Sequence, residues 1–290
     1  MFHKYYRPKH LAEALAVLSE YEGRARVMAG GTDLIVQLNK GDISFEAAVD
    51  ITNIKELRYI IEEDGIKIGA LTTHTDLAQS SLLRQKAPSL ADAAGEVGSL
   101  QIRNVGTVGG NIVNAQPAAD AAIPLMALDA VATIVSASGA RQVALEMLYH
   151  PGGGTILDPC SEILTEITFR PPSDMGGGSA FGRLSKRKAL SLPVFNAAVV
   201  LLPAADDKNI MDARIVMGPV ARIPFRAREA ENLLRGNAFN EDLFHDAADT
   251  ASREAKPRDS LFRGSSAYRK KLAQVIVYRS LIKAWKDMGC

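Results

Sequence analysis

The chain has 290 residues, of which 47% are hydrophobic and 23% charged, and its formal net charge is +1. Such a composition is typical of a globular protein with two or three domains and excludes a disordered or low-complexity chain. A charge this close to zero also excludes a global basic field that would hold nucleic acid or an anionic membrane.

The start of the chain is expected to alternate strands and helices. Apolar residues at helical spacing predict a helix over about 10–21, and a short strand follows over 24–28. That strand runs into Ala29-Gly30-Gly31-Thr32-Asp33-Leu34, after which the helical period restarts. A second buried strand is expected over 47–51. Residues 24–40 therefore have the pattern of strand, glycine turn and helix.

The middle of the chain is expected to contain both element types. Segments 57–62 and 66–71 flank Asp64-Gly65, which predicts a hairpin. Two helices are predicted over 75–98, a helix over 121–128 and a strand over 131–135. Between them, 103–114 carries three glycines and three asparagines, so we expect a loop with special dihedral angles.

The last part of the chain follows two clear breakers, at 151–154 and 171–178. We place the main domain boundary in the second one. Strands are predicted over 195–202 and 212–217, joined by a loop at Asp206-Asp207, and helices over about 226–234, 240–254 and 266–287. This end should form a smaller α+β domain of about three strands plus helices.

The cysteines and histidines are not expected to form a metal site. The two cysteines, Cys160 and Cys290, are far apart, so the chain has neither an iron–sulfur ligand set nor a disulfide framework. No two of the histidines share helical ligand spacing; they are His3, His10, His74, His150 and His245.

Two further expectations concern the environment of the protein. No apolar stretch reaches the ~18 residues of a membrane span and no signal peptide is visible, so we expect a cytoplasmic protein with no membrane span. Local basic clusters at 256–258 and 269–271 are expected to be solvated faces rather than nucleic-acid sites.

Two glycine loops are candidates for phosphate binding. Glycines remove the Cβ atoms that keep a ligand from the backbone, so successive N–H groups of 30–33 can converge on phosphate oxygens. Taken alone, a tight turn is the better interpretation of that loop. The second loop, 106–111, changes the balance, because a diphosphate between two halves of a cofactor would use two loops. Neither loop matches GxGxxG or GxxxxGK[ST].

These paired motifs, Ala29 to Leu34 and Ile102 to Ile112, closely resemble those of the FAD-binding subunit of molybdenum hydroxylases, the relatives of xanthine, carbon monoxide and nicotinate dehydrogenases. The resemblance covers nearly the whole chain. It implies an α+β protein with the two-subdomain FAD-binding fold shared with vanillyl-alcohol oxidase. Its parts would be residues 1–57 and 58–175, with FAD between them, and a C-terminal flavoprotein domain over 178–290.

The resemblance also implies the cofactor-binding residues. The first loop and the residues before it would bind the FAD diphosphate, the second loop would do so from the other subdomain, and further contacts would come from an asparagine, an acid, an apolar backbone position and a basic residue. Arg183, in a segment similar to F-x-K-x-x-x-R-K over 181–188, replaces the lysine of that pattern. The full set is Val27, Met28, Ala29, Gly30, Gly31, Thr32, Asp33, Leu34, Thr107, Val108, Gly109, Gly110, Asn111, Asn114, Asp120, Ile163 and Arg183.

The function implied is that of an oxidoreductase subunit that relays electrons. A molybdenum-cofactor subunit would oxidise the substrate, a second partner would carry two [2Fe–2S] clusters, and FAD on this chain would pass electrons to NAD, oxygen or another acceptor. This chain would hold no metal ligand and no catalytic residue of its own. Two alternatives stay open, a stand-alone FAD oxidase or dehydrogenase and a binding module without turnover.

Overall fold

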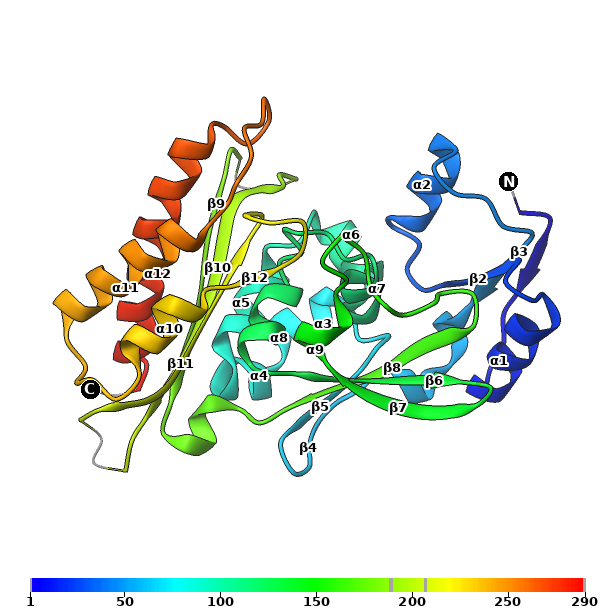
Figure 1. Cartoon of the computed structure of the whole chain (residues 1–290). Coiled ribbons are helices and arrows are strands. Elements are labelled where there is room, and N and C mark those ends of the chain that lie inside the picture. Colours follow the sequence, from blue (N-terminus) through cyan, green and yellow to red (C-terminus); the bar gives the residue numbers. More distant parts are fainter. Residues whose placement is uncertain (1, 188–189, 206–207, 289–290) are drawn as a thin grey trace.

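The computed structural model describes residues 2–187, 190–205 and 208–288. Its strands form three separate sheets, which follow one another along the sequence and along the long axis of the molecule (Figure 1). The expected loop at Asp206-Asp207, and Lys188 and Cys290, lie outside the described residues. The α+β class is confirmed, since each sheet is covered by helices.

The first sheet is parallel and contains β1 (Lys4–Tyr6), β3 (Ala47–Asp50) and β2 (Ala25–Met28), in that spatial order. Parallel neighbours need crossover connections, which α1 (Leu11–Glu20) and α2 (Leu34–Lys40) provide. Ala14 and Leu18 of α1 lie four residues apart and are buried against the sheet. The predicted order of strand, glycine turn and helix over 24–40 is therefore confirmed.

The second sheet is antiparallel, and its strands have the spatial order β4-β5-β8-β6-β7. These are β4 (Ile60–Glu62), β5 (Ile66–Gly69), β8 (Glu162–Phe169), β6 (Val131–Ser136) and β7 (Gly139–Ala144). The predicted hairpin joins β4 to β5, with positive φ at Asp64 and Gly65. The helices of this region are α3 (His74–Gln79), α4 (Ser81–Lys86), α5 (Pro88–Gly95), α6 (Leu100–Val105), α7 (Val108–Val113), α8 (Ala122–Ala127) and α9 (Leu145–Leu148).

The prediction of an irregular loop over 103–114 is wrong, because this segment forms the end of α6 and all of α7. Gly106, Gly109 and Gly110 do not have positive φ. At Gly109 the lack of a side chain serves close approach instead, because a Cβ there would lie 2.8 Å from the carbonyl oxygen of Ala70. The prediction of two helices over 75–98 also changes, because Ser80 and Pro88 divide that segment among α3, α4 and α5.

The third sheet has the order β12-β11-β10-β9. Its strands are β9 (Gly178–Ser185), β10 (Pro193–Pro203), β11 (Ile210–Gly218) and β12 (Phe225–Arg226), so the expected number of about three is corrected to four. The central strand β10 is buried on both faces. Phe195 and Val199 pack on the helix side, whereas Ala198 and Val200 join the core of the middle region, because successive side chains point to opposite faces.

Three helices cover the outer face of the third sheet: α10 (Arg228–Leu234), α11 (Glu241–Glu254) and α12 (Ser266–Lys286) (Figure 1). An ion network that includes β12 and α10 ties this domain to the middle one. Arg226 of β12 contacts Asp129 at 2.6 Å and the buried Glu231 at 2.6 Å. Two carboxylates of opposite charge offset the cost of burying this guanidinium.

Candidate functional site

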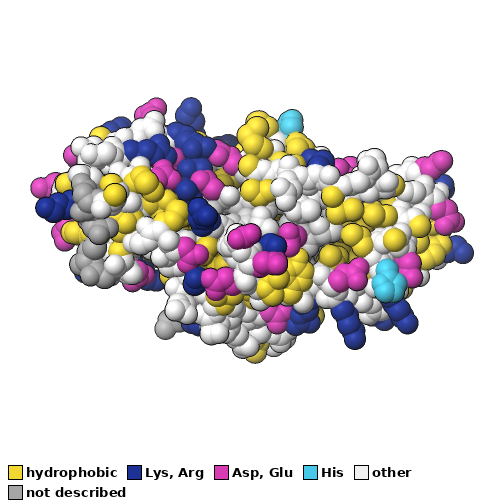
Figure 2. All heavy atoms as spheres, turned by 90° about the horizontal axis from the view of Figure 1, so that it is seen from below, with side chains coloured by type: hydrophobic (Ala, Val, Ile, Leu, Met, Phe, Trp, Pro, Cys, Tyr) yellow, Lys and Arg dark blue, Asp and Glu magenta, His cyan; other side chains and the backbone are white. Residues whose placement is uncertain are grey.

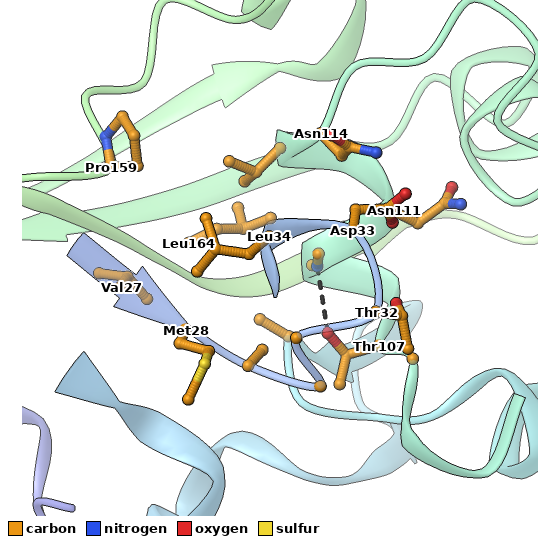
Figure 3. Close-up of a pocket in the computed structure, with 18 of the residues that line it drawn as sticks. Val27, Met28, Thr32, Asp33, Leu34, Thr107, Asn111, Asn114, Pro159 and Leu164 are labelled. Carbon is orange, nitrogen blue, oxygen red and sulfur yellow. Dashed lines mark hydrogen bonds between the residues drawn. The ribbon is translucent and has the colours of Figure 1, made fainter. Parts of the chain in front are cut away.

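A cavity of about 410 Å³ lies where the parallel and antiparallel sheets meet. The end of β2, the first glycine loop and α2 form one wall, and α7, β8 and the segment 154–159 form the others. Figure 3 shows Thr32 and Asp33 of the first loop beside Thr107 and Asn111 of the second, with Val27, Leu164 and Pro159 further along. Segments far apart in the chain therefore build a single cavity.

The first loop presents free backbone donors to this cavity. Gly31 has φ +69°, a conformation that favours glycine. Among the described residues, nothing accepts a hydrogen bond from the N–H groups of Gly30, Gly31, Thr32 and Asp33. Together they form a concave donor surface suited to an anion.

The second loop differs, because all of its backbone donors except Thr107 N have an acceptor within the described part of the protein. Val108 N donates to Thr72 O at 2.9 Å, and Gly109 N donates to Ala70 O at 3.0 Å. Gly110 N donates to the hydroxyl of Thr107, which caps α7 (3.1 Å) and is the bond drawn in Figure 3. What this loop offers the cavity is side-chain atoms and a close-packed surface.

The two loops are held against each other by direct contacts. A Cβ on Gly30 would lie 1.9 Å from the carbonyl oxygen of Val105, so only glycine permits this approach. Gln37 of α2 donates to Asn114, just after α7, at 3.1 Å. Burial raises the pKa of the neighbouring Asp33 carboxyl, and a hydrogen bond with Asn114 opposes that rise. The relative position of the two walls is therefore fixed by the same residues that line the cavity.

Two buried polar atoms in the cavity wall have no partner among the described residues. They are the side-chain oxygen of Asn111 and Nδ1 of His74. Burial, with a further contribution from the charge of Arg103, lowers the pKa of His74 to about 4, so its imidazole is neutral near pH 7. Buried polar groups are normally hydrogen-bonded, so both atoms indicate that a polar ligand completes this wall.

Most of the predicted site residues line the cavity: Val27, Met28, Ala29, Gly30, Gly31, Thr32, Asp33, Leu34, Thr107, Gly109, Gly110, Asn111, Asn114 and Ile163. Val108 does not, because its side chain is completely buried in the core. Sequence reasoning placed Gly106 in the second loop but missed His74, Gly154, Thr155, Leu157 and Pro159. A lone histidine after Thr72-Thr73 gives no motif, and Gly154 had only been interpreted as part of a breaker.

Asp120 and Arg183 lie together, outside the lining of this cavity. Arg183 Nε contacts Asp120 Oδ1 at 3.1 Å, and Asn196 donates to the same oxygen at 2.8 Å. Burial raises the pKa of Asp120 to about 6, although both partners act in the opposite direction. Their predicted contacts with the cofactor stay predictions.

Other classes of site find no support in the described part of the chain. No cluster of histidine, cysteine and acidic side chains there could hold a metal ion. None of the helices it contains is long and apolar enough to cross a membrane. On the face shown in Figure 2, acidic side chains stand among the basic ones.

A cavity between two α+β lobes, lined by free backbone donors and apolar walls, defines a protein that binds an extended organic cofactor. The family model described as "FAD binding domain in molybdopterin dehydrogenase" matches residues 1–171. The model of the "CO dehydrogenase flavoprotein C-terminal domain" matches residues 164–284. The chain therefore belongs to the family of FAD-binding flavoproteins of the molybdopterin dehydrogenases, and FAD is its cofactor.

Individual relatives agree with this assignment over the whole length. The xanthine dehydrogenase FAD-binding subunit of Escherichia coli O157:H7 is 32% identical, over 99% of this chain and 98% of the relative. The carbon monoxide dehydrogenase medium chain of Hydrogenophaga pseudoflava is 31% identical, over 97% and 96%. A solved structure of carbon monoxide dehydrogenase from that organism superposes with a TM-score of 0.91 at 31% identity, over 99% of this chain and 98% of the other.

The residues present fit FAD. The N–H groups of Gly30 to Asp33 could supply donors for its diphosphate. The unpaired oxygen of Asn111 could supply an acceptor for an N–H or O–H group. Val27 and Leu164 could supply apolar surface for its rings. The family and the cofactor expected from the sequence are thus confirmed, whereas the subdomain boundaries at 57 and 175 and each single contact stay predictions.

Proposed function

We propose that this chain is the electron-transferring flavin subunit of a multi-subunit molybdenum hydroxylase. Its partners would be a molybdenum-cofactor subunit and a subunit with [2Fe–2S] clusters, in a hetero-oligomer such as a heterotrimer. The observation that carries the proposal is the row of free N–H groups from Gly30 to Asp33 in a chain whose described residues offer no metal site. In such a complex this chain would hold the organic redox cofactor, and the metal centres would belong to its partners.

The role of this chain is to bind, orient and enclose the cofactor. FAD, when bound, supplies the capacity to accept and release electrons singly or in pairs. The amides of Gly30 to Asp33 would hold its diphosphate, and Asn111 would accept a hydrogen bond from it. His74 would face it as a neutral imidazole and add no charge. Val27 and Leu164 would exclude water from its rings.

The acceptor of the electrons is part of the proposal. NAD is our first candidate, with oxygen or another acceptor as alternatives. We also propose a cytoplasmic location, because the sequence has no disulfide framework.

The experiment that tests the proposal uses the full chain purified with FAD. We expect dithionite to reduce it and NADH to exchange electrons with it. Turnover of purines, aldehydes and N-heterocycles should be almost absent until the molybdenum and iron–sulfur subunits are added. Robust oxidation of any such substrate by this chain alone, with an artificial acceptor, would overturn the relay and favour a stand-alone oxidase or dehydrogenase. A purified chain without flavin absorbance would contradict FAD binding altogether.

A further inference from the structure

A second cavity, of about 450 Å³, lies in the C-terminal part of the molecule. It is formed by residues 219–222 after β11, by the connection between α11 and α12 over 256–263, by Arg269 of α12 and by Pro117. It shares no lining residue with the cavity assigned to FAD. The α11–α12 connection that forms one wall is the long loop beyond the ends of these helices in Figure 1.

The lining of this cavity is strongly basic. Its cations are Arg222, Lys256, Arg258, Arg263 and Arg269, and its single carboxylate is Asp259. Asp259 accepts a hydrogen bond from Ser266 N at 2.6 Å. None of the five cations forms an ion pair with a carboxylate of the described residues. Elsewhere in the same domain Arg214, Arg226 and Arg235 do form such pairs, whereas the cations that line this cavity do not.

Arg269 is the deepest of these cations and is not a solvated side chain, contrary to the expectation for the cluster 269–271. It is only 3% exposed. Its Nη1 donates to the carbonyl oxygen of Arg258 at 3.0 Å, but Nε and Nη2 have no partner among the described residues. Burial, with the nearby charge of Arg263, lowers its pKa. A guanidinium nonetheless keeps its charge in proteins, so two donors and a positive charge are left without a counter-ion.

We infer that this cavity binds an oxyanion of the phosphate class, held by Arg269 in its interior and by Arg258 and Arg263 nearer to solvent. Two free N–H groups on one planar guanidinium match two oxygens of such an anion. Five cations against one carboxylate are better balanced by a dianion than by a single carboxylate. The anion can be free phosphate or the phosphate of a soluble nucleotide. This inference goes beyond the proposed function and does not depend on it.

The test is calorimetric titration of the FAD-loaded full chain with sodium phosphate, against sodium chloride at equal ionic strength. We expect saturable binding of phosphate and none of chloride. Arg263→Gln should weaken phosphate binding about tenfold, because it removes a charged hydrogen-bond donor. The matched control is Lys271→Gln, which removes the same charge from α12 at an exposed position outside the cavity and should leave binding unchanged.

Arg269→Gln should abolish the saturable binding of phosphate, and circular dichroism shows whether this variant is folded. If it is not folded, the phosphate affinities of Arg263→Gln and Arg258→Gln test the inference. A second titration with AMP separates the two sources: AMP that binds at least as tightly as phosphate and competes with it identifies a nucleotide, and AMP that does not bind identifies free phosphate. FAD affinity should be the same in Arg263→Gln and wild type, which keeps this result separate from the flavin site.

Two outcomes would overturn the inference. One is the absence of saturable phosphate binding by the folded wild type. The other is equal weakening by Lys271→Gln and Arg263→Gln, which would mean diffuse surface charge. If phosphate does not bind and the substitutions at Arg258 and Arg263 instead weaken assembly with partner subunits, a carboxylate of another chain fills the cavity and the oxyanion site is refuted.

Discussion

The two glycine loops of the flavin cavity look alike in sequence and differ in what they do. In the first, Gly30 to Asp33 keep their N–H groups free, and Gly31 adopts a conformation that favours glycine. In the second, residues 108–111 are helical, every backbone donor except Thr107 N is paired among the residues that the structure describes, and Gly109 allows α7 to approach Ala70. A glycine can thus serve backbone conformation or close approach, and only the first use exposes donors to a ligand.

The comparison has an energetic consequence. Substitutions in the first loop should mainly lower the affinity for FAD, because the N–H groups of this loop have no partner among the described residues. Changes in the second should act mainly on the stability of the fold, because its groups are already satisfied. Gly30 is the exception, since it belongs to the first loop but packs on Val105 and Gly106, where the second loop begins.

The largest effect is expected for Gly30→Ala. Its Cβ would lie 1.9 Å from Val105 O, so the two loops must separate. We expect a loss of about 3 kcal/mol in the free energy of unfolding, since overpacking against backbone is poorly relieved, and a loss of retained FAD. Urea unfolding and flavin absorbance of the purified variant measure these effects.

The control for this change is Gly95→Ala at the end of α5. The added Cβ would have one neighbour, at 3.9 Å, and φ there is not positive. This variant should keep both its FAD and its stability. Full FAD retention by Gly30→Ala would contradict the contact between the loops.

Much of this cavity could be predicted from the sequence, and the failures have specific causes. Gly30 and Gly31 follow a strand and precede a helix, so the local pattern located the first loop. The same composition at Gly106, Gly109 and Gly110 predicted irregular backbone, which is wrong, because Gly109 and Gly110 lie in α7 and Gly109 allows that helix to contact Ala70. Sequence spacing does not encode such a contact.

His74 was missed for a related reason. Its side chain belongs to the cavity only because α3 packs beside α6, with His74 N donating to Gly106 O at 3.1 Å. Strands β7, β8 and β9 were not predicted because their apolar residues alternate weakly or lie beside glycine-rich breakers. The arrangement of Asp120 with Arg183 likewise joins positions that only the fold brings together.

The second prediction concerns His74, which lies beside the second loop, and the way its burial makes the stability of the protein depend on pH. The pKa of His74 falls from an ordinary 6.5 to about 4 in the folded protein. As pH drops below about 6.5, the unfolded chain takes up this proton first, so stability decreases until about pH 4. The loss from this residue alone is roughly 3 kcal/mol. Asp120, with a raised pKa of about 6, acts in the opposite direction over its own range.

The measurement is therefore a difference between two proteins. The free energy of unfolding of wild type and His74→Gln is followed from pH 7 to pH 4. Because Asp120 contributes to both curves, the gap between them isolates His74 and should narrow by roughly 3 kcal/mol. Parallel curves would show that His74 titrates normally and is not buried as a neutral group.

The third prediction concerns the residue whose conformation exposes the donors. Gly31→Val places a β-branched side chain at φ +69°, 3.3 Å from Ile35. We expect FAD affinity to fall at least about a hundredfold, since the donor surface is distorted, with a fold penalty of only about 1–2 kcal/mol. Fluorescence titration with FAD gives the affinity. Gly109→Ala should do the opposite. It should lower the free energy of unfolding more than Gly31→Val does and lower the affinity for FAD less.

The smallest effect is expected for Thr107→Ala. The Thr107 hydroxyl accepts the hydrogen bond of Gly110 N and caps α7, so its removal should lower the free energy of unfolding by about 1 kcal/mol. Thr107→Ser keeps the hydroxyl and should restore most of that stability. If the second loop acts through its packing, FAD affinity should follow stability in both variants. A large loss of affinity in Thr107→Ala at nearly unchanged stability would mean that this hydroxyl binds the cofactor directly, and the second loop would then resemble the first in function as well as in sequence.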